Sequence, residues 1–207
     1  MRLKSALRRG VAAAVIAGIV VSSGIPAYAG TWNIADGDIT VKAGDTEGTN
    51  WVTQGEKEDV KDTDTVITGE SDKSTVTIDT SKGNVDVTFD DLKINVSGKA
   101  EGDVSDKTEV DGNDDGPVRE SNVAVTVKGG HDATIELDGD NELKSGGKNA
   151  GLEKNEHESK GTLTIKDDND TKGALTAEGG FGGAGIGGGI ESTGSSITIR
   201  GGAVEAV

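Results

Sequence analysis

Apolar residues alternate with polar ones in short runs along most of the chain after residue 30. The apolar positions within a run are two residues apart. This period is that of a β-strand with one buried face and one face toward water. The clearest runs carry Val76/Ile78, Val85/Val87/Phe89, Leu92/Ile94/Val96, Val123/Val125/Val127, Ile135/Leu137, Leu163/Ile165 and Ile197/Ile199. The pattern predicts an all-β fold.

A unit of two such runs followed by a glycine-rich corner occurs and then recurs. Matching points are separated by 28 residues (135 to 163), 32 (143 to 175), 33 (146 to 179) and 34 (150 to 184 and 163 to 197). A repeat of about 20–50 residues built from strands is typical of a solenoid, in which successive turns of the chain stack on one another. Glycines at the corners allow tight turning and close approach. We therefore predict a parallel β-helix over residues 75–207.

Composition alone would also fit a disordered chain, because glycine and charge are abundant and aromatic residues are few. The valines, isoleucines and leucines nevertheless keep a regular phase, which a disordered chain has no reason to do. We expect an ordered fold.

Residues 30–74 are less regular, with strand-like runs at residues 32–34, 39–41 and 66–67. A solenoid needs a segment that covers the apolar surface of its first turn. We expect residues 30–74 to form N-terminal strands and this cap. Trp32 and Trp51 are the candidates to cover that end, and a sugar-stacking platform is the alternative role for them.

Residues 1–29 have the pattern of an export signal. Four basic residues precede an apolar run at 11–21, and Ala27-Tyr28-Ala29 fits an A-x-A cleavage site. The apolar run is too short for a bilayer, which takes about 20 residues. We expect a cleaved signal peptide, a secreted or cell-surface protein, and no membrane span in the mature chain.

Cleavage after residue 29 would remove four positive charges and no negative charge, changing the formal net charge from −16 to −20. Nucleic-acid binding depends on Lys and Arg displacing counterions, so such a chain is not expected to bind nucleic acid. The chain has no cysteine, so no disulfide supports the fold.

An acidic insertion at residues 99–120 interrupts the repeats. Within it, Asp111, Asn113, Asp115 and Gly116 follow the opening of a calcium-binding loop, since calcium prefers several oxygen ligands around a sharp turn. The bidentate Glu expected at position twelve is replaced by Asn122. Asp111, Asn113 and Asp115 are thus a calcium candidate, and a solvated acidic loop is the alternative.

Gly180, Gly182 and Gly185 formally fit the G-x-G-x-x-G pattern of dinucleotide-binding proteins. That function requires a helix directly after the glycines. The next residues are too rich in glycine for a stable helix. A tight corner is the better interpretation.

The segments DGDNELKSGGKNAGLE (138–153), GTLTIKDDNDTKGALTAEGGFGGAGIGGG (161–189) and SSITIRGGAVEA (195–206) resemble exported bacterial proteins described as carbohydrate-binding-domain-containing. The resemblance covers residues 75–207. It implies a right-handed parallel β-helix at the cell surface, with calcium and an acidic or cellulosic polysaccharide as ligands in some relatives. It brings no fixed catalytic motif.

Three functions remain after these observations. We favour a role in adhesion, through contact with an extracellular polysaccharide or with a host or cell-surface glycan. A structural stalk without a ligand is the first alternative. A polysaccharide lyase or hydrolase is the second alternative, because fold alone does not exclude catalysis. Lyases of this fold need a basic residue beside a calcium cluster. The only arginines left after cleavage are Arg119 and Arg200, and most of the numerous lysines lie in acidic turns. We therefore expect no enzyme.

The repeat begins again at residues 195–207 and stops there. We expect from this that the β-helix is incomplete at its C-terminus, or that another segment covers its last turn.

Overall fold

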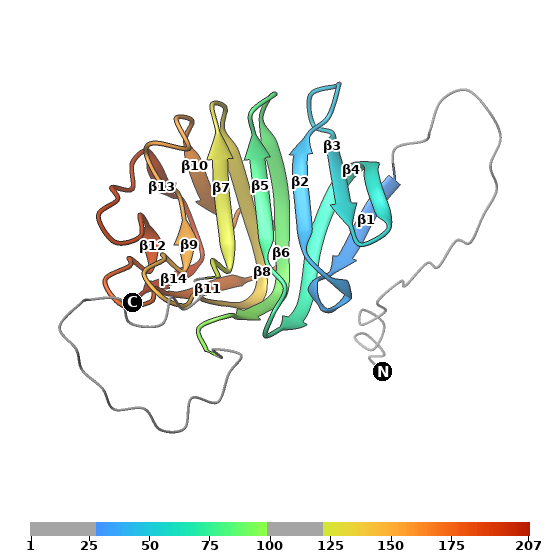
Figure 1. The fold of residues 1–207 in the computed structure, drawn as a ribbon. Coiled ribbons are helices and arrows are strands. Elements are labelled where there is room, and N and C mark those ends of the chain that lie inside the picture. The colour runs from blue at the N-terminus through green and yellow to red at the C-terminus, as the bar shows by residue number, and fades with distance from the viewer. Residues whose placement is uncertain (1–27, 99–121) are drawn as a thin grey trace, which may run out of the picture.

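The computed structural model describes residues 28–98 and 122–207, and these residues form an all-β structure (Figure 1). The strands are β1 (Tyr28–Asn33), β2 (Ile39–Ala43), β3 (Asn50–Gln54), β4 (Lys57–Ser71), β5 (Val76–Thr80), β6 (Val85–Asn95), β7 (Val125–Gly129), β8 (Ala133–Lys144), β9 (Leu152–Glu153), β10 (Leu163–Lys166), β11 (Gly173–Glu178), β12 (Ile186–Gly187), β13 (Ile197–Ile199) and β14 (Ala203–Ala206). A three-residue 3₁₀ helix, η1 (Ile34–Asp36), is the only helix in the described part of the chain. No helix there is long and apolar enough to cross a bilayer. The expected all-β class is confirmed.

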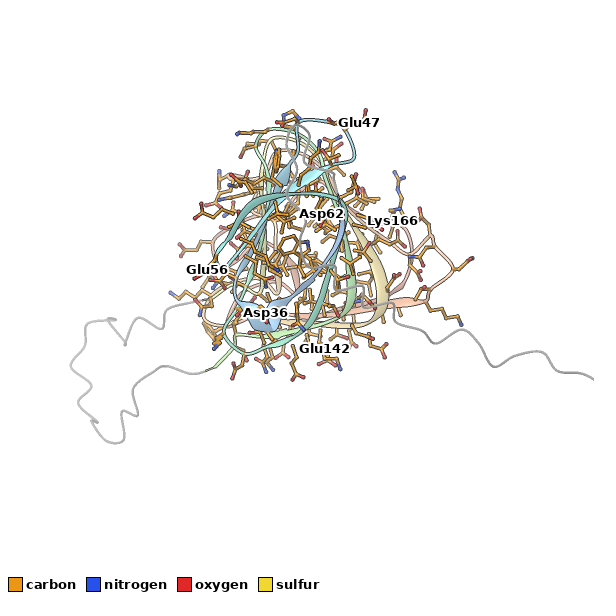
Figure 2. All side chains as sticks on the ribbon, turned by 90° about the vertical axis from the view of Figure 1, so that its right-hand side faces the viewer. Asp36, Glu47, Glu56, Asp62, Glu142 and Lys166 are labelled. Atoms are coloured by element: carbon orange, nitrogen blue, oxygen red, sulfur yellow. The ribbon has the colours of Figure 1, made fainter. Side chains whose placement is uncertain are left out.

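Most strands pair in parallel, in three ladders. Ladder A consists of β2, β5, β7, β9 and β12. Ladder B consists of β1, β4, β6, β8, β10 and β13. Ladder C contains the second halves of β4, β6 and β8, followed by β11 and β14. In the end-on view of Figure 2, the strands surround a common interior.

One antiparallel strand joins two of the ladders. β3 pairs antiparallel with β2 on one side and with the first half of β4 on the other. Ladders A and B are thereby joined at the N-terminal end of the stack, and the sheet is nearly closed on itself. Figure 1 shows β1, β3 and β4 together at this end.

The long strands β4, β6 and β8 each turn a corner between ladders B and C. The corner residues Gly69, Asp91 and Gly139 have φ of 92°, 50° and 64°. Short polar residues such as aspartate adopt a positive φ more readily than other non-glycine residues. The Asp91 side chain is also held in place, because its Oδ1 accepts a hydrogen bond from Asp140 N of β8 at 2.9 Å. A Cβ at Gly139 would overlap the Asp91 carboxylate, and φ is positive there, so both favour glycine.

The interior is filled by the alternating apolar residues predicted from the sequence. Val76, Val85, Phe89, Ile135 and Leu163 are all fully buried. Each such side chain contributes roughly 1.5–3 kcal/mol relative to an exposed position.

Asn141 is a buried polar residue whose side chain bonds to several strands. Its Oδ1 accepts from Leu92 N at 2.9 Å, and its Nδ2 donates to Asp138 O and Ala174 O at 3.0 Å each. It therefore links three successive turns of the chain.

The predicted register between turns is wrong at several points. Leu163 pairs with Ala133 rather than Ile135, and Leu143 pairs with Ala177 rather than Leu175. Each shift is two residues, which leaves every side chain on the same face of the strand. An alternating pattern does not distinguish such registers, and Ala133 and Ala177 carry only a weak apolar signal.

Leu163 and Ile165 pair with Ile197 and Ile199, as the 34-residue spacing predicts. Ile165 is fully buried, but Ile199 is 51% exposed because β13 pairs with β10 on one side and with no other described strand. The expected row of stacked apolar side chains is therefore buried as far as β10 and becomes exposed to solvent at β13.

The two tryptophans differ in their surroundings. Trp32 is 5% exposed, its Nε1 donates to Asp62 Oδ2 at 2.7 Å, and the Lys57 ammonium lies 5.4 Å from the ring centre. Trp51 is half-buried on β3. The burial of Trp32 leaves no ring face free for stacking on a sugar.

Candidate functional site

A groove of about 530 Å³ lies on the outer side of ladder B. Its floor consists of outward-facing residues of neighbouring strands, including Thr88 of β6, Thr134 and Glu136 of β8, and Lys166 of β10. Figure 2 shows Lys166 outside the ring of strands, on the opposite side from Glu56. The groove thus crosses several strands, and a ligand lying in it would contact several turns of the chain.

The first wall of the groove is built by the start of β3 and by the middle of β4. Asn50 is buried, and its Nδ2 donates to Thr65 Oγ1 at 2.9 Å and to Asp86 O at 2.7 Å. The β1–β4 register shifts opposite Asp62 and Asp64, which pair with Tyr28 and Ala29, the last two residues of the predicted signal peptide. One extra residue of β4, Thr63, stands between the two aspartates. A bulge of this kind bends a strand and re-aims its side chains. Here Thr63 and Asp64 face solvent and line the groove.

The second wall is the turn after β10. Asp168 N donates to Glu136 Oε1 at 3.0 Å, and Asn169 Nδ2 donates to Asp138 Oδ1 at 2.7 Å. Because backbone and side chain both bond to β8, this wall is fixed to the floor before any ligand arrives. Preformed walls reduce the entropy that a ligand must lose on binding.

An ionic group lies in the floor at this wall. Lys166 Nζ is 2.9 Å from Glu136 Oε2 and 2.8 Å from Asp168 Oδ1. The hydrogen bonds to Asp168 and Glu136 raise the pKa of Lys166, and the Lys166 ammonium lowers the pKa of Asp168. Glu136 is only 9% exposed, because its Oε1 accepts from Asp168 N and its Oε2 is covered by the Lys166 ammonium.

The other carboxylates of the groove are free. Asp64 and Asp86 are exposed, and neither side chain takes part in a hydrogen bond or ion pair with a described residue. Counting Glu136, Asp168 and Lys166 as well, the groove has a formal charge of −3.

The sequence-predicted calcium candidates Asp111, Asn113 and Asp115 lie outside the described residues. The structure therefore does not place them near the groove or away from it. Within residues 28–98 and 122–207, no group of three or more His, Asp or Glu side chains is arranged to hold a metal ion.

The G-x-G-x-x-G segment forms a corner, as expected. Gly182 has φ of 75°, Phe181 is 83% exposed, and β12 follows where a dinucleotide-binding protein has a helix.

Sequence reasoning did not find the groove. Its residues are the polar positions of the same alternating runs whose apolar positions build the interior. The available signal was the row of outward positions Asp86, Thr88, Thr134, Glu136 and Lys166, which stacks only when the strand register is known.

We compared the chain with models of protein families, with curated proteins and with solved structures, and none of the three comparisons finds a match.

Proposed function

We propose that the chain is a secreted or cell-surface right-handed parallel β-helix that contacts an extracellular polysaccharide through the groove on ladder B, without catalysis. The three parallel ladders support the β-helix, because a chain that passes repeatedly through the same three faces produces this pairing. The resemblance seen in the sequence supports the exported location.

The observation that carries the proposal is the preformed, open, polar groove across the strands. Threonine hydroxyls, Asn169 and free carboxylates offer donors and acceptors for sugar hydroxyls. A polymer lying along the groove would contact several turns at once, so that many weak contacts add to one useful affinity.

Two observations favour binding over catalysis. The raised pKa of Lys166 keeps its amine protonated, which makes it a poor general base for a lyase. Glu136 and Asp168 are already engaged with Lys166, so neither stands free as a proton donor.

A glycan array probed with the full chain, with calcium and with a chelator, tests the proposal. Thr134→Trp fills the floor of the groove. Thr126→Trp is the matched control, because Thr126 is also a half-buried, outward-facing strand threonine, but on ladder A. We expect the parent and Thr126→Trp to bind the same glycans and Thr134→Trp to lose them. Equal binding by all three proteins, or binding by none, would contradict the proposal.

Calcium is tested separately. We expect calorimetric heat on adding calcium to the parent, and its loss in an Asp111→Ala/Asp115→Ala variant. If both proteins give equal heats, these residues are not the site.

A further inference from the structure

The predicted cleavage site and a buried carboxylate meet at one residue, Gly30. Cleavage after Ala29 would make Gly30 the first residue of the mature chain, with a protonated α-amine in place of its amide N–H. In the structure Gly30 lies in β1, and its backbone nitrogen donates to Asp62 Oδ1 at 2.9 Å. The atom that cleavage would convert into a cation therefore already contacts a carboxylate.

Asp62 is held in the interior by hydrogen bonds. It is 1% exposed, and Figure 2 places it within the ring of strands at the N-terminal end of the stack. Besides Gly30 N, Trp32 Nε1 donates to Asp62 Oδ2 at 2.7 Å and Asp64 N donates to Asp62 Oδ1 at 3.1 Å. All three partners are donors, which suits the ionised form of the carboxylate.

This carboxylate has no cationic partner among the described residues. No ion pair joins Asp62 to a Lys, Arg or His side chain within residues 28–98 and 122–207. The Lys57 ammonium lies over the Trp32 ring instead, 5.4 Å from its centre. Burying a charge is costly unless it is both hydrogen-bonded and paired. A cation at Gly30 N would supply the missing pair.

The choice of glycine at position 30 is a second, independent observation. A Cβ added to Gly30 would lie 2.6 Å from Asp62 Oδ2 and 2.7 Å from Trp32 Nε1. Such distances are too short for a real Cβ, so any other residue would move the backbone nitrogen away from the carboxylate. The cleavage pattern depends on Ala27 and Ala29 and does not itself call for glycine after them.

We infer that Asp62 is the binding site for the α-ammonium group of Gly30, and that removal of the signal peptide completes this site. Before cleavage Gly30 offers Asp62 one neutral N–H. After cleavage it offers a charged group with three N–H donors, which forms stronger hydrogen bonds. The processed chain is then more stable than its precursor, so the fold is consolidated after export. The inference goes beyond the proposed function, because it uses the predicted cleavage and not the groove.

The test uses the full chain, exported and processed by a bacterial host. Mass spectrometry identifies the first residue of the purified protein, which we expect to be Gly30 with a free amine. The comparison protein has one additional alanine between Ala29 and Gly30. It keeps the A-x-A site and the same net charge, but its ammonium lies one residue further along β1, and Gly30 retains a neutral N–H.

At pH 7 we expect the parent to melt at least about 5 °C above the extended chain, because a buried carboxylate that loses its charged partner is strongly destabilising. In an Asp62→Asn background the same extension should change the melting temperature by less than about 1 °C. Asp36→Asn is the matched control, because Asp36 is an exposed carboxylate in η1, directly after β1. In that background the extension should keep its full effect.

The pH dependence identifies the amine as the group responsible. An ordinary α-amine loses its proton near pH 8, and pairing with Asp62 raises the pKa of the Gly30 amine above that value. The advantage of the parent should thus be complete below about pH 8 and be lost by about pH 10. The charged groups around this amine are Asp62, Asp64 and Lys57, and carboxylates and lysine amines ordinarily titrate outside this interval.

Two results would overturn the inference while leaving the proposed function intact. One is a chain that begins at Gly30 but melts with the extended chain at pH 7, and the other is a difference between them that does not change with pH. A mature chain that begins at another residue would also contradict the inference alone. A chain that keeps Met1 in the exporting host would contradict both the inference and the exported location. If Asp62→Asn does not fold, the pH dependence of the parent and of the extended chain still decides.

Discussion

Individual side chains hold successive turns of the chain together by two means. Apolar residues such as Ile165 stack on the residue in the same position of the next turn, here Ile135 and Ile199. Buried polar residues such as Asn141 and Lys154 bond to backbone groups of other turns. The first kind supplies most of the stability, and the second kind fixes which strand lies against which.

Ile165→Ala should lower the free energy of unfolding by about 2–5 kcal/mol, because it leaves a cavity between two turns. Thr164→Ala, on the outward side of the same strand, should cost less than about 1 kcal/mol. Urea unfolding followed by tryptophan fluorescence measures both. Equal losses would show that Ile165 does not face the interior.

Lys154 has no exposed surface, and its Nζ donates to Ser159 O at 3.2 Å and to Ser195 O at 2.8 Å. Burial lowers the pKa of Lys154 below its ordinary value of 10.5. Between the lowered folded-state pKa and 10.5, the unfolded chain binds more protons at this site than the folded chain. The contribution of Lys154 to stability should therefore rise with pH through that interval.

Chemical denaturation of the parent and of Lys154→Met at a series of alkaline pH values measures this contribution. We expect the stability difference between them to move in favour of the parent as the pH approaches 10.5. Lys172→Met, at an exposed position, should show no such trend. A difference that does not change with pH would mean that burial leaves Lys154 unperturbed.

At the scale of strands and corners, close stacking depends on glycine where two turns meet. Gly151 lies one repeat before Gly185, and Leu152 N donates to Gly185 O at 2.9 Å. A Cβ at Gly151 would lie 2.8 Å from that oxygen and 2.8 Å from Glu178 N. Both neighbours are backbone atoms, so neither can rotate away.

Gly151→Ala should therefore separate the two turns and destabilise the protein by about 1–3 kcal/mol. Gly130 is the matched control, because it is an exposed glycine without a positive φ, and a Cβ added there would have no neighbour within 4 Å. Gly130→Ala should be neutral or stabilising by up to about 1 kcal/mol. The measurement is the melting temperature of each variant. Equal melting temperatures for Gly151→Ala and Gly130→Ala would contradict the close backbone contact at Gly151.

The strands and their inward faces could be predicted from the sequence because a period of two survives in runs as short as residues 163–165. The register of β10 on β13 also follows from the 34-residue spacing. The register of β8 against β10 and β11 could not be predicted, because Leu163 over Ala133 and Leu163 over Ile135 satisfy the same alternation. The antiparallel strand β3 was also missed, since Trp51 and Val52 alone do not reveal an alternating pattern. The position of the groove depends on the register of β8 against β10 and on the β4 bulge. Neither can be read from the sequence, so the groove could not be predicted.

At the scale of the whole molecule, the two ends of the stack differ. The hairpin of β3 and β4 lies at the N-terminal end. At the other end, β13 and β14 each pair on one side only within the described residues, and Ile199 is 51% exposed there. An unpaired strand edge of this kind favours association with another chain, while the strong net negative charge opposes it.

The chain should thus associate through this end at high protein concentration, more strongly when salt screens the repulsion between copies. Ile199→Lys should suppress the association, since a lysine on an edge strand opposes pairing. Thr126→Lys, in the middle of ladder A, should not. Sedimentation velocity at low and high salt measures this, and a monomer under every condition would contradict it.

The corner between β6 and β7 differs in length from the corresponding corner one turn later. Residues 96–124 connect β6 to β7, whereas residues 145–151 connect β8 to β9. The ladders on either side nevertheless keep their register, with Thr80 beside Gly129 and Asn95 beside Lys144. The fold therefore accepts connections of very different length at this corner while the strands on either side stay paired in register. A foreign epitope inserted into this connection should leave the paired strands on either side intact, which makes it a natural position for peptide display.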